Sequence, residues 1–278
     1  MPTAYSDKLD QLANQEPLIT KVRSNVSAPP PLTKVNSGPT TQAPYHPPLD
    51  LNPDSLTKGI EHYEAHSGYV SPAVQAFSAL YVGLQKLSDA KKQLAKDPSK
   101  TEAQQVLMLA GEAEKLQDRC TRQFDDARKR LMDGIKGIDE MLSGPLTHKA
   151  DNTLSGELRA LCRSMTSDER AKFLNDAMHD RDMTVLTAIL GGHHALSGLT
   201  KERRAHLTRQ FHEATNPEVT QRLAVMRSAL ERVEQRAGLV LVETQRALGA
   251  KWDVVQKLRT AGSASEAALL LINNPPQS

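Results

Sequence analysis

After residue 70, apolar residues recur at steps of three and four along most of the chain, and no segment there alternates between apolar and polar residues. Steps of three and four place side chains on one face of an α-helix, whereas alternation would indicate a β-strand. The pattern therefore predicts an all-α protein. We expect a long helical hairpin, a cluster of short helices and a second long helix, preceded by an extended proline-rich N-terminal arm.

The helical hairpin is expected in residues 71–145. Ser71 is a good helix-capping residue and Pro72 suits the first helical position, so the first helix is predicted to begin there and to end at residues 97–98. The second helix is predicted to follow and to end at Leu142. A tight turn between two such helices makes them antiparallel neighbours.

The second hairpin helix repeats its apolar positions every eleven residues. From Ala113 these positions follow steps of three, four and four. An eleven-residue repeat corresponds to about 3.67 residues per turn and predicts nearly straight packing instead of the left-handed twist of a heptad coiled coil. The expected buried positions are Val106, Leu109, Ala113, Leu116, Cys120, Phe124, Ala127, Leu131, Ile135, Ile138 and Leu142.

Shorter periodic segments follow in residues 146–215. Each of them begins with a residue whose side chain can cap a helix N-terminus, and glycine-containing breaks separate the last two. We therefore predict a cluster of four short helices in this part of the chain. Their expected ranges are 153–165, 167–179, 182–190 and 200–214.

The second long helix is expected within residues 216–278. Its apolar pattern runs without interruption from Pro217 to Gly262. Gly238 and Gly249 lie inside this range, and each glycine lowers the stability of a helix interior by about 1 kcal/mol. A bend at either glycine is therefore compatible with the pattern.

A short tail helix is predicted at residues 265–272, and it is apolar almost all round. A helix of that kind has to be covered. The cover is either the chain's own bundle or a partner protein, and the sequence leaves both alternatives open. In the second case the contact residues are Leu269, Leu270 and Ile272.

Residues 1–70 are predicted to form a short helix followed by an extended arm. Nine of the 16 prolines fall within residues 17–55. Proline lacks an amide donor and restricts the residue before it, so this segment is not expected to form a helix or a central strand. It also has little apolar surface with which to order itself, so we expect it to act as a tether held by a partner.

Two groups of residues in the arm are candidate partner contacts. The first is the proline run Pro29, Pro30 and Pro31. The second is Pro44, Tyr45 and Pro47, which belong to a P-x-x-P pattern of the kind that aromatic grooves bind as a polyproline helix. The same pattern also arises in proline-rich linkers that bind nothing.

The charge is nearly balanced, with 35 basic and 33 acidic residues and a formal net charge of +2. A dedicated nucleic-acid-binding domain would be strongly basic, so nucleic-acid binding is expected to be weak at most. Basic residues do cluster on two predicted helices, but glutamates interleave with them, which favours a solvated, ion-paired face over a phosphate-binding stripe. The basic residues are Lys201, Arg203, Arg204, Arg209, Arg222, Arg227, Arg232 and Arg236, and the acidic ones are Glu202, Glu213, Glu231 and Glu234.

No apolar run is long enough to predict a membrane span, and the first residues do not resemble a signal peptide. We therefore expect a soluble protein made in a cytoplasm. The two cysteines, Cys120 and Cys162, lie within helical patterns and are expected to be small buried apolar residues.

Catalytic motifs are not found in the sequence. His62 and His66 are four residues apart, but Glu64 is not next to the first histidine as the zinc protease motif requires. Other histidines, at 193, 194, 206 and 212, form no recognised ligand pattern, and neither a phosphate-binding glycine loop nor a nucleophile elbow occurs. We expect no catalytic residues, no metal site and no cofactor, and therefore a protein that is not an enzyme.

One segment resembles proteins of a known group. Residues 186–204, LTAILGGHHALSGLTKERR, are similar to a segment of uncharacterised proteins encoded among the head and structural genes of tailed bacteriophages, in which a helix, a short loop and an LSGLT turn precede a charged helix. The similar segment covers less than a tenth of the chain and holds no catalytic residue.

The resemblance implies a virion protein, made in the bacterial host cytoplasm. We expect a non-enzymatic structural or assembly component of the phage head or portal, present in several copies, in contact with capsid or portal proteins and tethered by its N-terminal arm. The alternative is a cytoplasmic helical adaptor or regulator that associates with nucleic acid through its basic helices.

Overall fold

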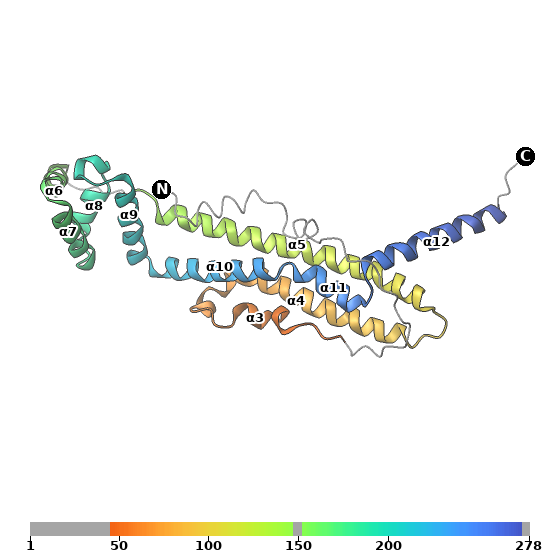
Figure 1. Ribbon diagram of the computed structural model, residues 1–278. Coiled ribbons are helices and arrows are strands. Elements are labelled where there is room, and N and C mark those ends of the chain that lie inside the picture. The colour runs from red at the N-terminus through yellow and green to blue at the C-terminus, as the bar shows by residue number, and fades with distance from the viewer. Residues whose placement is uncertain (1–44, 147–151, 274–278) are drawn as a thin grey trace, which may run out of the picture. The chain divides into compact units, whose positions relative to one another are not determined.

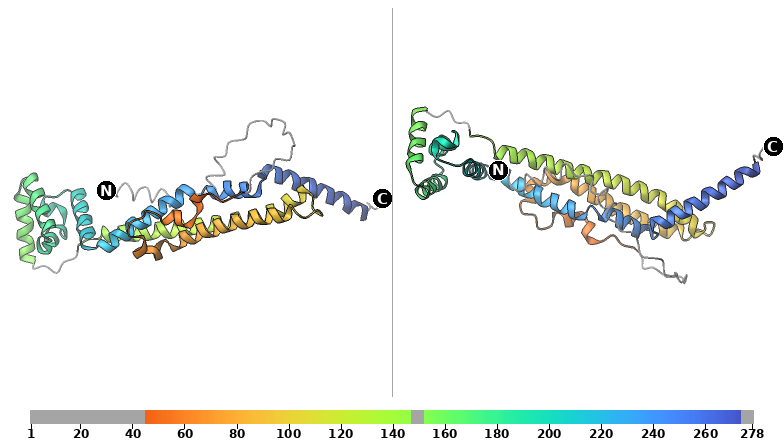
Figure 2. Two further views of the ribbon diagram at one scale, coloured as in Figure 1. Left: turned by 90° about the horizontal axis from the view of Figure 1, so that it is seen from below. Right: turned by 45° about the horizontal axis from the view of Figure 1, so that its top comes forward.

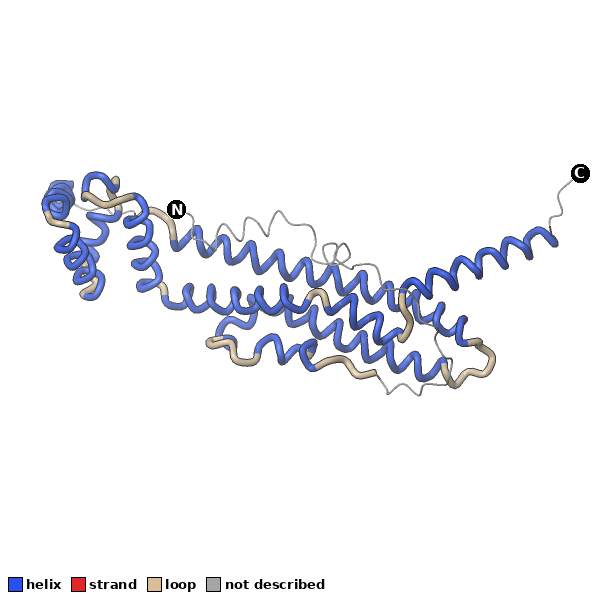
Figure 3. Tube along the Cα trace, in the orientation of Figure 1, coloured by secondary structure: helices blue, strands red, loops and turns tan. Residues whose placement is uncertain are grey.

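The structure, a computed structural model, describes residues 45–146 and 152–273, and every regular element within these residues is a helix (Figures 1 and 3). The prediction of an all-α protein is therefore confirmed. The elements are η1 (Leu49–Leu51), α3 (Pro53–Thr57), α4 (Tyr63–Leu94), α5 (Glu102–Leu142), α6 (Asn152–Ser164), α7 (Ser167–His179), α8 (Met183–Leu190), η2 (His194–Ser197), α9 (Lys201–Thr215), α10 (Pro217–Arg236), α11 (Leu239–Leu248) and α12 (Trp252–Asn273).

The chain divides into two compact units, whose boundaries fall inside α5 and inside α10. The described residues of the first unit are 132–224, which include the short helices α6 to α9. Those of the second unit are 45–131 and 225–273, which include α3, α4, α11 and α12.

In the second unit, α4 and α5 run antiparallel as a hairpin, and α11 lies alongside α4 (Figures 1 and 2). The rings of Phe77 and Phe124 meet in its core, with centroids 4.9 Å apart. Further along the hairpin, a Cβ atom added to Gly83 would collide with the side chain of Leu116. Glycine at this position therefore leaves room for the Leu116 side chain against the backbone of α4.

The expected buried face of α5 is confirmed. Each of its eleven predicted positions is buried except Val106, which is half-buried. Lys129 and Arg130, which lie off this face, are exposed. The eleven-residue repeat thus identified the face of α5 that packs.

The start of α4 differs from the prediction. The helix begins at Tyr63, after His62 in the left-handed conformation, and Pro72 lies inside it instead of at its first position. Val70, Ala73 and Phe77 are all buried and share one helical face. The packing of this face extends the helix back through Pro72, although proline removes one hydrogen bond of the helix.

The second long helix is not continuous, contrary to the prediction. It is interrupted after Arg236 and again at Gly249, whose φ of 75° is left-handed and whose amide donates to the carbonyl of Gln245 at the end of α11. The chain then resumes as α12, which passes through Gly262. The predicted helix end at Gly262 was therefore wrong, because a single glycine lowers the stability of a helix by only about 1 kcal/mol.

The described part of the predicted arm is also more structured than expected. Residues 49–57 form η1 and α3, with Pro53 at the first position of α3 and the side chain of Asn52 accepting from the amide of Asp54. Leu51 and Leu56 are fully buried against the bundle. Proline is tolerated at the first position of a helix, which is why this prediction failed for residues 49–57. The remainder of the arm, residues 17–44, lies outside the described residues.

The first unit has its own core, built where α6, α7, α8 and α9 converge. The predicted short helices match α6 to α9 to within one residue at each end, whereas the 3-10 turn η2 was not predicted. The core of this unit consists of Leu146, Cys162, Leu174, Ala177, Leu186, Ile189, Leu190, Leu199, Leu207 and Phe211.

Candidate interaction surfaces

The second unit anchors the start of the described chain through Tyr45. The Tyr45 hydroxyl donates to Oε2 of Glu243 at 3.0 Å, and the Ser88 hydroxyl donates to the Tyr45 carbonyl at 3.2 Å. Glu243, on α11, is only 2% exposed and also accepts from Nη1 of Arg246 at 2.6 Å. Burial, the bond to Glu243 and the negative charge of that residue raise the pKa of Tyr45 above its usual value near 10, and Arg246 opposes this shift.

These contacts bear on the P-x-x-P candidate. Pro47 is buried against the chain's own helices, and the Tyr45 hydroxyl is already bonded. A groove on another protein would have to detach this segment before binding it. Pro29, Pro30, Pro31 and Pro44 lie outside the described residues.

Two arginines of α10 hold α3. Nη1 of Arg232 donates to the carbonyls of Leu56 and Lys58, at 2.7 and 2.9 Å, and more weakly to that of Ser55. Arg236 donates to the Ser55 hydroxyl at 2.9 Å. The last carbonyls of a helix lack partners within the helix, so Arg232 acts as a cap for the C-terminal end of α3, and Arg236 adds a bond to the Ser55 side chain.

Arg170 has the same role in the first unit. Its guanidinium donates to the carbonyls of Cys162 at 2.8 Å, Met165 at 2.8 Å and Gly198 at 2.6 Å. The first two belong to the end of α6 and the turn after it, and the third follows η2. From α7, one side chain thus ties the end of α6 to the residue that follows η2. Arg159 likewise donates to the Ala188 carbonyl in the last turn of α8.

The predicted basic cluster is largely used inside the fold. Arg204 donates to the Gly192 carbonyl at 2.6 Å. Arg209 pairs with Asp139 at 2.7 Å and with Glu213 at 2.8 Å. Burial lowers the pKa of Arg209, but the bonds to the two carboxylates outweigh it and raise the pKa above the usual range. These guanidinium groups hold parts of the chain together and do not form an open stripe.

The cysteines are buried free thiols, as predicted. Burial raises the pKa of Cys120 to about 11. The stacked rings of His193 and His194 have centroids 4.3 Å apart, and Nδ1 of His194 lies 3.2 Å from the Leu199 carbonyl. Among the described residues, no group of three or more histidines, cysteines and carboxylates is placed to hold a metal ion.

The C-terminal half of α12 forms the clearest uncovered surface. The first half is anchored by the buried Val255 and by Arg259, whose guanidinium binds both carboxylate oxygens of Glu114 at 2.7 and 2.8 Å. Toward its C-terminal end, α12 leads away from α5 and α11 (Figure 1). Leu269 and Leu270 are 61% and 62% exposed, so in this single chain its own bundle does not cover them. The side chain of Ile272 lies outside the described part.

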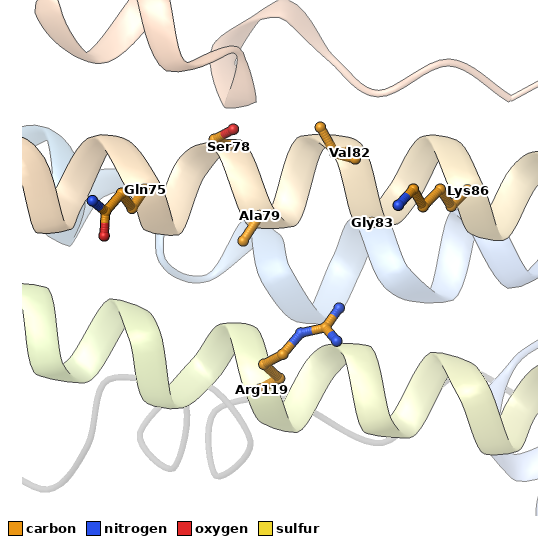
Figure 4. A pocket seen from close by; sticks show the side chains of 7 residues that line it. All are labelled: Gln75, Ser78, Ala79, Val82, Gly83, Lys86 and Arg119. Atoms are coloured by element: carbon orange, nitrogen blue, oxygen red, sulfur yellow. The ribbon is translucent and has the colours of Figure 1, made fainter.

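Two hollows in the described surface were not expected from the sequence. A shallow groove of about 400 Å³ lies between α4 and α5, and Lys86 and Arg119 are the charged residues among those that line it (Figure 4). The second hollow, in the first unit, has a volume of about 360 Å³ and is mainly apolar, with Met178, Met183 and Phe211 among its lining residues. Both depend on how helices meet, and no sequence pattern marks them.

Comparisons of the chain with protein-family models, with curated proteins and with solved structures gave no match. Within the described residues, no helix is long and apolar enough to cross a membrane.

Proposed function

We propose that this protein is a non-enzymatic structural or assembly component of a larger particle, and that it docks on a partner through the C-terminal half of α12. The observation that carries the proposal is the exposure of Leu269 and Leu270 on a helix whose first half is firmly anchored. The resemblance of residues 186–204 to phage structural proteins supports a tailed-phage virion as the particle, with a place in the head or near the portal.

The energetics favour a partner at this surface. Burying a leucine side chain that is otherwise exposed stabilises a complex by about 1.5 to 3 kcal/mol. Two adjacent leucines on a rigid helix lose little conformational freedom on docking, because the helix is already formed. The bidentate pair of Arg259 with Glu114 fixes the base of that helix and so presents the leucines in a defined position.

The rest of the second unit is suited to a spacer or clamp. Its long antiparallel helices are joined by a continuous buried face, and its arginines hold the shorter segments to them. We propose that residues 1–44 add a tether to this body, as the proline content of that region suggests.

The docking surface is tested by incorporation into particles. The double variant Leu269→Ser, Leu270→Ser should be lost from purified particles while its far-ultraviolet circular dichroism stays unchanged. The matched control is Leu154→Ser with Leu161→Ser, which removes two other exposed leucines from α6. If both double variants enter particles as well as the original chain, the docking role of α12 is wrong.

The tether is tested by a deletion of residues 1–44. This deletion spares Tyr45, Pro47 and Leu51, which pack on the bundle, so the helical body should remain folded. Particles should then contain much less of the truncated protein. Normal incorporation of the truncated chain would show that residues 1–44 do not act as a tether.

A further inference from the structure

We propose that the partner of the α12 tip is a second copy of this chain, and that the tip docks into the apolar groove of the first unit formed by α7, α8 and α9. The tip is defined as residues 266–270. This inference deepens the proposed function and rests on it, because it names the partner of the same surface.

The groove suits an apolar helix. Met178, Met183, Leu186, Phe211 and Pro217 are among its lining residues, and Met183 is exposed. Methionine side chains are flexible and polarisable, and they often line surfaces that accept the apolar face of a helix. A volume of about 360 Å³ is at the small end of binding pockets, and it suits a few anchoring side chains better than a whole helix.

The tip carries its anchors on one face. Glu266, Leu269 and Leu270 are related by steps of three and four residues, so they lie side by side on α12. Such steps are typical of helices that bind in grooves. Glu266 is also the one charged residue between Arg259 and the end of the helix.

Charge complementarity connects the two surfaces. Arg181 is the charged residue among those that line the groove, and it is exposed. Asp180 and Asp182 flank Arg181 in the sequence, but neither of them lines the groove, and one Asp182 carboxylate oxygen is turned to the amides of Thr184 and Val185 at the start of α8. A tip whose leucines enter the groove can therefore place Glu266 against Arg181.

The backbone conformation of Arg181 is a second, independent indication that its side chain has a role in binding. Arg181 follows Asp180, the C-cap of α7, and adopts the left-handed conformation with φ of 53°; the next amide, of Asp182, closes the turn on the Ala177 carbonyl. Glycine is the usual residue at this position because it has no Cβ. An arginine here is a poor choice for the turn alone, which is consistent with a role for its side chain in binding.

Docking of this kind is head-to-tail, because the tip and the groove are different surfaces of one chain. Head-to-tail contacts produce a ring when the rotation closes and an open chain when it does not. Either product contains several copies, as the proposed particle component would.

The first experiment measures self-association of the full-length chain by sedimentation velocity over a range of concentrations. The original chain should associate, and Leu269→Asp with Leu270→Asp should abolish the association. Val254→Asp, which changes an exposed apolar residue at the base of the same helix, is the control and should leave association intact. A chain that stays monomeric at every concentration overturns the inference.

The second experiment reverses the charges of Glu266 and Arg181, first one at a time and then together. Glu266→Arg and Arg181→Glu should each weaken association by about five- to tenfold, because each places like charges together. The variant with both changes should recover to within about threefold of the original, since the pair is then restored in reverse. An equal mixture of the two single variants should also associate better than either variant alone. Failure of both forms of rescue overturns the inference.

Arg181→Gly provides a further readout. Glycine relieves the left-handed turn, so the thermal midpoint should rise or stay the same while self-association weakens. If Arg181 served the turn alone, association would not change. A chain that enters particles without self-associating would contradict only this inference, and one that self-associates but enters no particle would contradict only the proposed function.

Discussion

Several arginine side chains in this protein bind backbone carbonyls at or near the ends of helices. Arg170 binds four carbonyls of the first unit, and Arg232 binds the end of α3 in the second. The planar guanidinium carries five donors in a fixed arrangement, so one side chain can satisfy several carbonyls that a lysine could not reach together. Much of the positive charge of the chain is thus part of its folding.

Arg170→Met should destabilise the first unit by about 2 to 3 kcal/mol, because it leaves carbonyls of α6 and η2 without their donor while keeping much of the aliphatic packing. Urea unfolding measures this loss. The control is Arg163→Met, an exposed arginine on the same stretch of chain, which should change stability by no more than about 0.5 kcal/mol. Equal losses in the two variants would contradict the role given to Arg170.

Tyr45→Phe should cost about 1 to 2 kcal/mol, since it removes the hydroxyl that donates to the buried Glu243. The pKa of Tyr45 is raised in the folded state, so the folded protein holds the phenolic proton more tightly than the unfolded chain does. The contribution is therefore complete below pH 10 and is lost as the pH rises above that value.

The measurement is the difference in unfolding free energy between the original chain and Tyr45→Phe, followed from pH 7 to pH 11. The difference should stay constant up to about pH 9.5 and then shrink, because the unfolded tyrosine ionises near its usual pKa of about 10. A difference that grows above pH 10 would have the wrong sign for this hydrogen bond.

At the scale of elements, the sequence predicted the buried face of α5 and the ends of the short capped helices, but it missed the ends that tertiary packing decides. The buried positions of α5 follow directly from apolar spacing, because burial of one face is what the spacing records. The start of α4 was missed because the burial of Val70 and Ala73 outweighs the local signal of Pro72. Gly249 ends α11 and Gly262 ends nothing, although both are single glycines within apolar patterns. The two glycines differ in backbone conformation, because Gly249 adopts a left-handed φ and Gly262 does not. Tertiary packing decides this difference.

The packed face of α5 predicts a contrast between neighbouring positions. Leu131→Ala removes a buried leucine and should cost about 2 to 5 kcal/mol, through lost burial and the cavity that it leaves. Lys129→Ala, two residues earlier on the exposed side, should change stability by no more than about 0.5 kcal/mol. Chemical unfolding measures both, and similar losses at the two sites would refute the eleven-residue assignment.

At the scale of the whole molecule, the sequence marked residues 265–272 as apolar but left open what covers them. Hydrophobicity shows that a surface has to be buried, and only the arrangement of the helices shows that Leu269 and Leu270 are exposed in the single chain. The groove lined by Met178 and Phe211 could not be predicted at all, because its walls come from three helices whose contacts are not encoded locally. The arginine caps were missed for the same reason, since their acceptor carbonyls carry no sequence signature.

The net charge of the whole molecule favours the proposed particle component over the alternative, an adaptor that binds nucleic acid. With a net charge of +2, and with Arg204, Arg209 and Arg232 bonded inside the fold, we expect only weak binding to duplex DNA that disappears at physiological salt. The binding constant is measured as a function of salt concentration. On duplex DNA, the logarithm of the binding constant falls with the logarithm of the salt concentration with a slope of about −0.9 for each phosphate contact.

The informative variant in this experiment is Lys201→Ala with Arg203→Ala, because both side chains are exposed on α9 and their removal spares the internal bonds of Arg204 and Arg209. This variant should bind DNA as weakly as the original chain. Sub-micromolar binding that falls steeply with salt and is lost in this variant would falsify the particle assignment and support an adaptor that acts on nucleic acid. Because α9 begins at the end of the segment that resembles phage structural proteins, the same variant tests whether that segment serves assembly or nucleic-acid binding.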